Sequence, residues 1–190
     1  YSDYKKKQFH VVINAAMPSK RFWAKNNPEL DYDETVTKTE KILSDFKFKK
    51  IIHISSLSSR CQLHTVYGKN KRKSEEIIEK TNDYLIVRLG SMYGKGLIKG
   101  VLIDMLNNKK VYLDGKSKYS FTDIGWNSKW IIENLNSKSK LVEIGSTDSV
   151  ELEKLANMIK STSEFEGEVD NQTIINRSLK KETTMQVLNF

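Results

Sequence analysis

Tyr67 and Lys71 stand four residues apart, eleven residues beyond an apolar run that starts at Ile51 and ends in serines, IIHISS. On a helix this spacing puts both side chains on one face, about 6 Å apart along the axis. A free tyrosine has a pKa near ~10 and moves protons poorly at neutral pH, but a nearby ammonium favours its ionised form. A serine from the strand end, Ser56, can hydrogen-bond the same substrate oxygen. This set is typical of proton transfer coupled to hydride transfer at an alcohol or ketone.

The Tyr-x-x-x-Lys spacing has little specificity by itself. With 8 tyrosines and 27 lysines in 190 residues, about one match is expected by chance, and three occur. Tyr1/Lys5 lies in a terminal lysine cluster, and Tyr112/Lys116 spans an Asp-Gly turn signal. The serine-ended apolar run precedes only Tyr67/Lys71, so this pair is the candidate.

Composition indicates one ordinary domain, or one with a small lobe, and 38% hydrophobic residues make a packed core feasible. No apolar run is long enough to span a bilayer. A single cysteine, Cys61, excludes an internal disulfide and fits a reducing cytoplasm. With no cysteine pair and three scattered histidines, we expect no metal site.

The net charge of +8 favours anionic partners. Lysine supplies most of the positive charge and is spread along the chain, without the interleaved aromatic residues that a nucleic-acid stacking surface needs. The lysines therefore indicate a solvated surface first and an anionic small ligand such as a nucleotide second, and we expect no nucleic-acid or membrane partner.

Short, continuously apolar strands alternate with helical segments. The expected strands are residues 9–16, 50–54, 84–89, 110–113 and 141–144, and the expected helices are residues 28–46, 66–80, 97–106, 124–135 and 151–160, the last capped by the polar cluster 146–149. Residues 55–64 are expected to form a loop. This alternation predicts an α/β fold with a doubly wound parallel sheet.

Seven segments in order resemble the extended short-chain dehydrogenases/reductases, in the NAD-dependent epimerase/dehydratase group that acts on nucleotide sugars. They are VVINAA, NPELDYDETVTKTEKIL, IIHISS, YGKNK, YLIVRLGSMYGKG, DGKSKYSFTDI and LVEIGSTDSVELEKLANMI, within residues 9–159. The resemblance implies a Rossmann-like domain in residues 1–110 and a small, interleaved substrate lobe mainly in residues 111–190. It also implies an NAD or NADP cofactor, a nucleotide-sugar substrate and a homodimer.

By the same resemblance, Ser56 orients the substrate, Tyr67 moves the proton, and Lys71 lowers the tyrosine pKa and holds the nicotinamide ribose. The residues that it implies for cofactor binding are Asn14, Ala15, Ala16, Thr35, Ser55, Tyr67, Lys71, Leu89, Gly90 and Met92. Those that it implies for substrate binding are Ser58, Tyr93 and Lys118.

The chain departs from the family pattern at several positions. Thr35 replaces the family's asparagine, Asn70 replaces the serine before the lysine, and Leu89 replaces a proline. No glycine-rich phosphate-binding turn precedes Phe9, so we expect a fragment that starts inside the dinucleotide-binding domain. The later stretch from Gly94 to Gly100 has the wrong spacing and position to replace it.

The reaction class follows from what accompanies the serine. Family dehydratases carry an Asp-Glu pair after the catalytic hydroxyl, whereas Leu57 and Ser58 follow Ser56, which favours 4-epimerisation or keto reduction. Cys61 and His64 are a weaker alternative, an acid/base pair for epimerisation at a ring carbon. The rival hypothesis is a non-catalytic, nucleotide-binding or partner-binding relative of the same fold.

Overall fold

The computed structural model describes residues 4, 5 and 7–175, in two compact units. The first unit comprises the residues up to Arg88 together with Leu135–Val142. The second comprises Leu89–Asn134 and the residues from Glu143 onward. The predicted catalytic residues all belong to the first unit.

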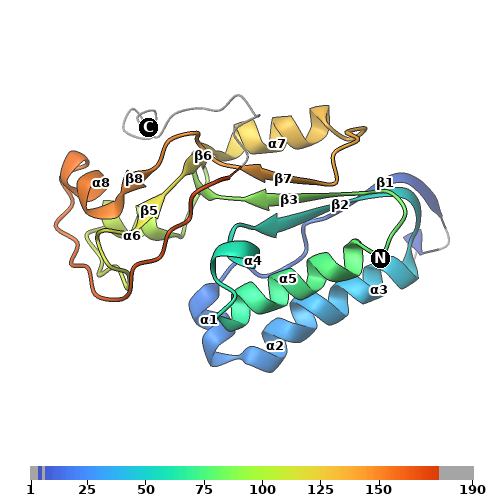
Figure 1. The fold of residues 1–190 in the computed structure, drawn as a ribbon, viewed down its shortest axis with the longest axis horizontal. Coiled ribbons are helices and arrows are strands. Elements are labelled where there is room, and N and C mark those ends of the chain that lie inside the picture. The colour runs from blue at the N-terminus through green and yellow to red at the C-terminus, as the bar shows by residue number, and fades with distance from the viewer. Residues whose placement is uncertain (1–3, 6, 176–190) are drawn as a thin grey trace. The chain divides into compact units, whose positions relative to one another are not determined.

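A four-stranded parallel sheet carries the fold, in the order β1-β2-β3-β7 (Figure 1). Its strands are β1 (Gln8–Asn14), β2 (Lys47–Ser56), β3 (Tyr84–Leu89) and β7 (Leu141–Ile144). β1 and β2 run parallel, with Asn14 opposite His53. Residues 50–53 in the middle of β2 are buried without alternation, as in a strand that is covered on both faces. The predicted α/β fold with a parallel sheet is confirmed.

Helices of the first unit fill the connections between these strands. They are α1 (Arg21–Asn26), α2 (Pro28–Tyr32), α3 (Lys38–Asp45), α4 (Ser58–Cys61) and α5 (Val66–Ile78). A π-helical turn, η2 (Asp33–Thr37), joins α2 to α3. The helix predicted from Pro28 is therefore present almost to its expected end, but with a widened turn in its middle. Pro28 occupies the first turn, where its missing N–H is not needed.

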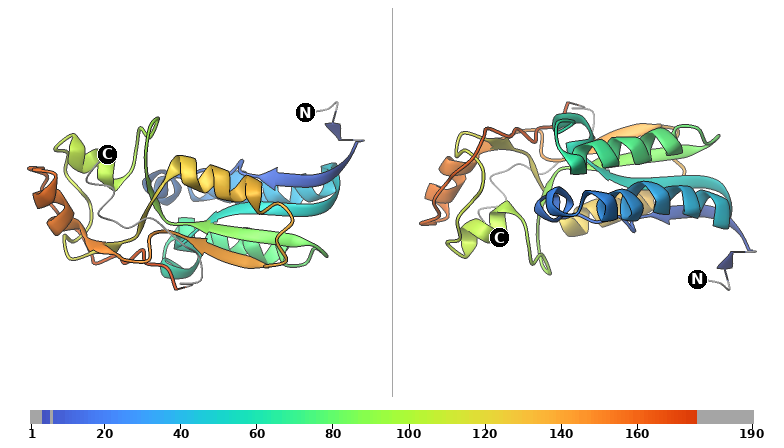
Figure 2. Two further views of the ribbon diagram at one scale, coloured as in Figure 1. Left: turned by 90° about the horizontal axis from the view of Figure 1, so that it is seen from above. Right: turned by 90° about the horizontal axis from the view of Figure 1, so that it is seen from below.

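A cluster of isoleucines fixes α3 and α5 to one face of the sheet. Ile42 of α3, Ile51 of β2, Ile78 of α5 and Ile86 of β3 pack together. The two helices lie side by side (Figure 2). Each buried isoleucine contributes roughly 1.5–3 kcal/mol relative to an exposed one, so the helix bearing Tyr67 is firmly tied to the strand bearing Ser56.

The second unit consists of short elements around its own core. They are β4 (Ser91–Tyr93), α6 (Val101–Leu106), β5 (Lys118–Tyr119), β6 (Phe121–Asp123), α7 (Ile124–Glu133), β8 (Val150–Glu151) and α8 (Leu152–Met158). β4 pairs with β6 in parallel and β5 with β8 antiparallel. Tyr93, Met105, Tyr119, Phe121 and Leu152 are among the buried residues of its core.

Four local expectations are wrong. The predicted strand at 110–113 is only an isolated bridge between Val111 and Phe165. The helix expected from residue 97 begins at Val101, because the glycines before it adopt positive φ, including Gly100 at 113°. The cluster 146–149 does not cap α8, which starts after Glu151 without a side-chain cap. Residues 55–64 are not all loop, since they contain α4.

Candidate active site

Ser56 and Tyr67 meet through their hydroxyl groups. Ser56 is the last residue of β2, and its hydroxyl hydrogen-bonds the phenol of Tyr67. The backbone N–H of Ser58 also donates to Ser56 Oγ, at 3.2 Å. The tyrosine side chain is 6% exposed, while Ser56 is half-buried. A buried phenol is thus paired with a more accessible serine at the carboxyl end of a parallel strand, where open α/β sheets bind ligands.

Lys71 lies one helical turn beyond Tyr67 on α5 and is 3% exposed. Its Nζ is 5.3 Å from the centroid of the Tyr67 ring, which is within cation–π range. The structure thus brings the three predicted catalytic side chains together.

Burial dominates the electrostatics of the pair. It raises the pKa of Tyr67 to about 12, although the Ser56 hydrogen bond and the Arg21 charge lower that pKa and the Asp31 charge raises it. Burial also lowers the pKa of Lys71 to about 8, against the charges of Asp31 and Glu75, which raise it. At neutral pH the phenol is therefore protonated and the lysine mostly charged.

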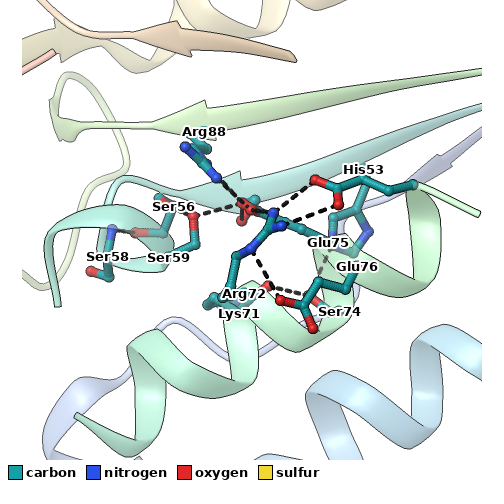
Figure 3. A network of polar contacts seen from close by, with 12 residues as sticks. His53, Ser56, Ser58, Ser59, Lys71, Arg72, Ser74, Glu75, Glu76 and Arg88 are labelled. Atoms are coloured by element: carbon teal, nitrogen blue, oxygen red, sulfur yellow. Dashed lines mark hydrogen bonds and ion pairs between the residues drawn. The ribbon is translucent and has the colours of Figure 1, made fainter. Parts of the chain in front are cut away.

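Glu75, one turn beyond Lys71, is the centre of a buried polar network (Figure 3). Its Oε1 accepts hydrogen bonds from the hydroxyls of Ser55 and Ser59, each at 2.6 Å, and both its oxygens bind Arg88 of β3. Burial alone would raise the pKa of this carboxyl, but the Arg88 and serine hydrogen bonds outweigh it and hold the pKa below its usual range. Since Ser55 and Ser59 flank Ser56, the network fixes the serine segment against the helix that bears Tyr67.

A second polar chain supports the same helix from β1 and β2. Asn14 Nδ2 lies 3.1 Å from His53 Nδ1, and His53 Nε2 lies 3.1 Å from Ser74 Oγ. The Ser74 hydroxyl donates to the backbone carbonyl of Lys71, at 2.7 Å. Burial and, after it, the Lys71 charge lower the pKa of His53 to about 4, against the Glu75 charge, which raises it. The imidazole is therefore neutral, and the lysine is held in place through its own backbone.

The start of α5 depends on a cap and a glycine. Thr65 caps the helix by accepting a hydrogen bond from Gly68 N at 3.0 Å. A Cβ at Gly68 would lie 2.1 Å from Gln62 O and 2.7 Å from Ser58 O, so a side chain there is incompatible with this backbone. The missing side chain lets Tyr67 approach the serine segment.

The residues expected to bind cofactor in the first unit differ in accessibility. Ala15 and Ala16 are exposed just after β1, as a small-residue surface should be. Asn14 is buried, and its side chain contacts His53 and accepts from Ala16 N at 3.3 Å. Ser55 donates to Glu75, and Thr35 is fully buried, with no hydrogen bond from its hydroxyl within the described chain.

All but one of the remaining predicted residues belong to the second unit. Tyr93 packs in that unit's core, and Gly90 N donates to Ile144 O at 2.7 Å. Leu89 and Met92 are half-buried. Lys118 is exposed and lies 3.8 Å from a carboxylate oxygen of Glu151. Their roles at the site stay predictions, as does that of Ser58 in the first unit, which is buried.

Sequence reasoning missed Glu75, His53 and Asp31. Glu75 had a usable signal, because a residue four positions after Lys71 shares its helix face. His53 and Asp31 had no such signal, because single polar residues in apolar strands and acidic residues in helices are common in proteins without a functional role.

Two further features are absent from the part of the chain that the structure describes. No group of three or more His, Cys, Asp or Glu there could hold a metal ion. No helix in the same part of the chain is long and apolar enough to cross a membrane.

The structure has close counterparts among solved structures. A UDP-N-acetylglucosamine 4-epimerase from Methanobrevibacter ruminantium M1, in complex with UDP-N-acetylmuramic acid, matches with a TM-score of 0.75 at 14% identity, over 94% of this chain and 73% of that one. A UDP-glucuronic acid 4-epimerase from Bacillus cereus, in complex with UDP-glucuronic acid and NAD, matches with 0.75 at 18% identity, over 94% and 72%.

A dTDP-4-dehydrorhamnose reductase from Bacillus anthracis, in complex with NADP, matches with a TM-score of 0.74 at 16% identity, over 95% of this chain and 79% of that one. No protein-family model matches the chain, and no curated protein sequence is significantly similar to it. At these identities the likeness establishes the fold. The chain has the Rossmann-like fold that these nucleotide-sugar epimerases and this reductase share.

Proposed function

We propose that this chain carries the proton-transfer side of an NAD(P)-dependent nucleotide-sugar site that performs 4-epimerisation or keto reduction. The observation that carries the proposal is the buried Tyr67 phenol, hydrogen-bonded to Ser56 and lying beneath the Lys71 ammonium. Ionisable side chains with shifted pKa values gather at functional sites, and burial shifts the pKa values of both Tyr67 and Lys71, which supports the proposal.

The residues present fit the reactive end of a dinucleotide. Ala15 and Ala16 offer an exposed surface of small side chains at the end of β1, and Lys71 would hold the nicotinamide ribose. An oxidised nicotinamide, when bound, supplies a hydride acceptor and a positive charge beside the phenol. The turns that follow β1 and β2 contain no glycine, so the fit concerns this end of the cofactor alone.

Each of the three side chains has one task. Ser56 hydrogen-bonds the substrate oxygen and holds it against Tyr67. In reduction the Tyr67 hydroxyl donates its proton to the developing alkoxide, and in oxidation it accepts the proton back. Because burial raises the pKa of Tyr67 to about 12, the oxidative direction needs nearby positive charge. Arg21 supplies part of it, and we assign a further part to Lys71, whose Nζ lies 5.3 Å from the centroid of the ring.

The proposed substrate class rests on the similar solved structures, and the proposed reaction rests on the residues that follow Ser56. The similar structures include enzymes that act on UDP-sugars and a dTDP-sugar. Leu57 and Ser58 follow Ser56, so no carboxylate accompanies the serine to eliminate water. We therefore favour epimerisation or reduction over dehydration, with Ser58, Tyr93 and Lys118 on the substrate side. A homodimer stays a prediction.

The test replaces Tyr67 by phenylalanine in the complete protein. UDP- and dTDP-sugars are assayed with NAD and NADP by nicotinamide absorbance and product chromatography. Tyr67→Phe should lower kcat/KM by roughly 10²–10⁴-fold, the usual contribution of a general acid–base group. Tyr32→Phe, on the exposed side of the adjacent helix, is the matched control and should keep full activity. Undiminished turnover by Tyr67→Phe contradicts the proposal.

A binding protein without turnover is the second candidate, and Asn70, which replaces the family's serine before the lysine, favours it. Titration with oxidised and reduced cofactor separates the two. Nucleotide-sugar binding without cofactor affinity supports the second candidate, and cofactor affinity that falls in Lys71→Met supports the enzyme.

A further inference from the structure

Asp31 is a fully buried carboxyl group on α2, and only one of its oxygens is hydrogen-bonded. Oδ2 accepts from Asn70 Nδ2 at 2.8 Å, whereas Oδ1 has no hydrogen-bond partner within the described chain. A buried carboxylate with an unsatisfied oxygen is costly, so this placement needs a reason. The reason lies on the helix that α2 packs against.

That helix is α5, which carries the Tyr67 and Lys71 side chains. Asn70, the partner of Asp31, immediately precedes Lys71, and the Asp31 charge acts on both Lys71 and Tyr67. The titratable and charged groups that act on this pair from the packed elements are Arg21 of α1, Asp31 of α2, His53 of β2 and Glu75 of α5.

We propose that Asp31 is a positioning residue whose carboxylate is the buried counter-charge of the Lys71 ammonium, held toward it by Asn70. It touches no substrate in this role and acts through the lysine. The inference deepens the proposed function, on which its catalytic meaning rests.

Glu75, the other acidic residue whose charge acts on Lys71, is already paired with two arginines. Its two oxygens accept hydrogen bonds from Ser55, Ser59, Arg72 and Arg88, so its charge is largely neutralised by two guanidinium groups. Asp31 has one donor, an uncharged amide, and a second oxygen that is not engaged by the described residues. Asp31 is therefore the less compensated negative charge near the lysine.

The two effects of Asp31 have the same sign. A negative charge favours the ammonium of Lys71 and disfavours the phenolate of Tyr67, so it raises both pKa values. Burial in turn raises the pKa of Asp31, whereas the Asn70 hydrogen bond and the Lys71 charge lower it. Removing the charge while keeping the shape, as Asp31→Asn does, should lower the pKa of Lys71 and of Tyr67 together.

The decisive measurement reads Lys71 directly and needs no turnover. The chain is labelled with ¹³Cε-lysine, the Lys71 signal is assigned by its loss in Lys71→Arg, and its chemical shift is followed with pH by NMR. Asp31→Asn should lower the pKa of Lys71 by about one unit, the lower end of the effect of a nearby opposite charge. Asp33→Asn, which removes an exposed carboxylate two residues away, is the matched control and should leave it unchanged.

A reciprocal measurement covers the case in which Asp31→Asn does not fold. In Lys71→Met, ¹³Cγ-aspartate NMR should show a higher pKa for Asp31, because coupling between two groups acts in both directions. If the pKa of Lys71 is unchanged in folded Asp31→Asn, or the pKa of Asp31 is unchanged in Lys71→Met, Asp31 is not the counter-charge of Lys71.

Kinetics connect the counter-charge to the reaction. In the pH profile of kcat/KM for substrate oxidation, Asp31→Asn should shift the alkaline-rising limb, which reports the ionisation of Tyr67, to lower pH, and Asp33→Asn should not. A shifted titration with no turnover on any nucleotide sugar rejects the proposed function and leaves the counter-charge standing. A shifted titration with an unmoved limb refutes the catalytic role of Asp31.

Discussion

Arg88 of β3 binds both carboxylate oxygens of Glu75: its Nε lies 3.0 Å from Oε1 and its Nη2 lies 2.7 Å from Oε2. This bidentate pair is buried, and bidentate guanidinium–carboxylate pairs are among the strongest hydrogen-bonded contacts in proteins. Breaking one side leaves the other charge uncompensated. Glu75→Gln should therefore lower the free energy of unfolding by about 3–5 kcal/mol, measured by urea denaturation.

The matched control for that experiment is Glu76→Gln, since Glu76 is half-exposed and pairs with Arg72 at the surface. Its effect should stay within about 1 kcal/mol. Equal losses from the two variants would mean that the Arg88 contact does not fasten α5 to the sheet.

Gly68 gives a prediction with an unusual sign. In an open helix, replacing glycine by alanine stabilises by about 1 kcal/mol. Here the new Cβ would lie 2.1 Å from the backbone oxygen of Gln62, so α5 must move away from α4. Gly68→Ala should destabilise by about 1–3 kcal/mol by chemical denaturation and lower activity through the Ser56–Tyr67 contact. Lys69→Ala, at the exposed next position, should change neither quantity, and a stabilised Gly68→Ala would disprove the close approach.

His53 predicts a specific acid sensitivity. Its pKa is about 4 in the folded chain and 6.5 ordinarily, so between these pH values the unfolded chain binds a proton that the folded chain excludes. Stability should therefore fall as the pH drops from 6.5 to 4, by about 3 kcal/mol from this group. Unfolding measured across this range should show that contribution missing in His53→Gln and retained in His64→Gln, whose histidine is exposed. Parallel curves for the wild type and His53→Gln would contradict it.

Lys71 predicts the corresponding behaviour in alkali. Its pKa is about 8 when folded against 10.5 ordinarily, so above pH 8 the unfolded chain retains a proton that the folded chain has lost, and stability from this group rises with pH. Lys71→Met lacks this term. The free energy of unfolding of Lys71→Met minus that of the wild type should therefore fall by about 2–3 kcal/mol between pH 8 and 10. The control is Lys69→Met on the exposed face of α5, and a constant difference for Lys71→Met would show that the lysine is not strained by burial.

The strands and the site pair were accessible from sequence because both depend on local patterns. The continuous apolar runs predicted β2, β3 and β7, and the four-residue spacing predicted a shared helix face for Tyr67 and Lys71. Neighbouring residues carry such signals, so one sequence suffices.

What the sequence did not reveal depends on contacts between distant residues. Glu75 meets Ser55 and Ser59 across 20 and 16 positions, and Asp31 meets Asn70 across 39. Glu75 has a spacing signal, since it lies four residues after Lys71 on α5. Nothing in the type or spacing of Asp31 distinguishes it from a solvated surface acid. The burial that shifts the pKa of Tyr67 upward is likewise a property of packing, not of the Tyr-x-x-x-Lys spacing.

The π-helical turn η2 stands between Asp31 and Thr39, which contact α5 and β1 respectively. A π turn holds more residues than an α turn, and each residue of an α-helix advances the side-chain direction by about 100°. Deleting one residue from Asp33–Thr37 would therefore rotate the helix before this turn relative to the helix after it. Asp31 and Thr39 would then point in different relative directions, even if every remaining side chain were kept. In this segment the number of residues, as much as their identity, decides whether the aspartate faces the lysine.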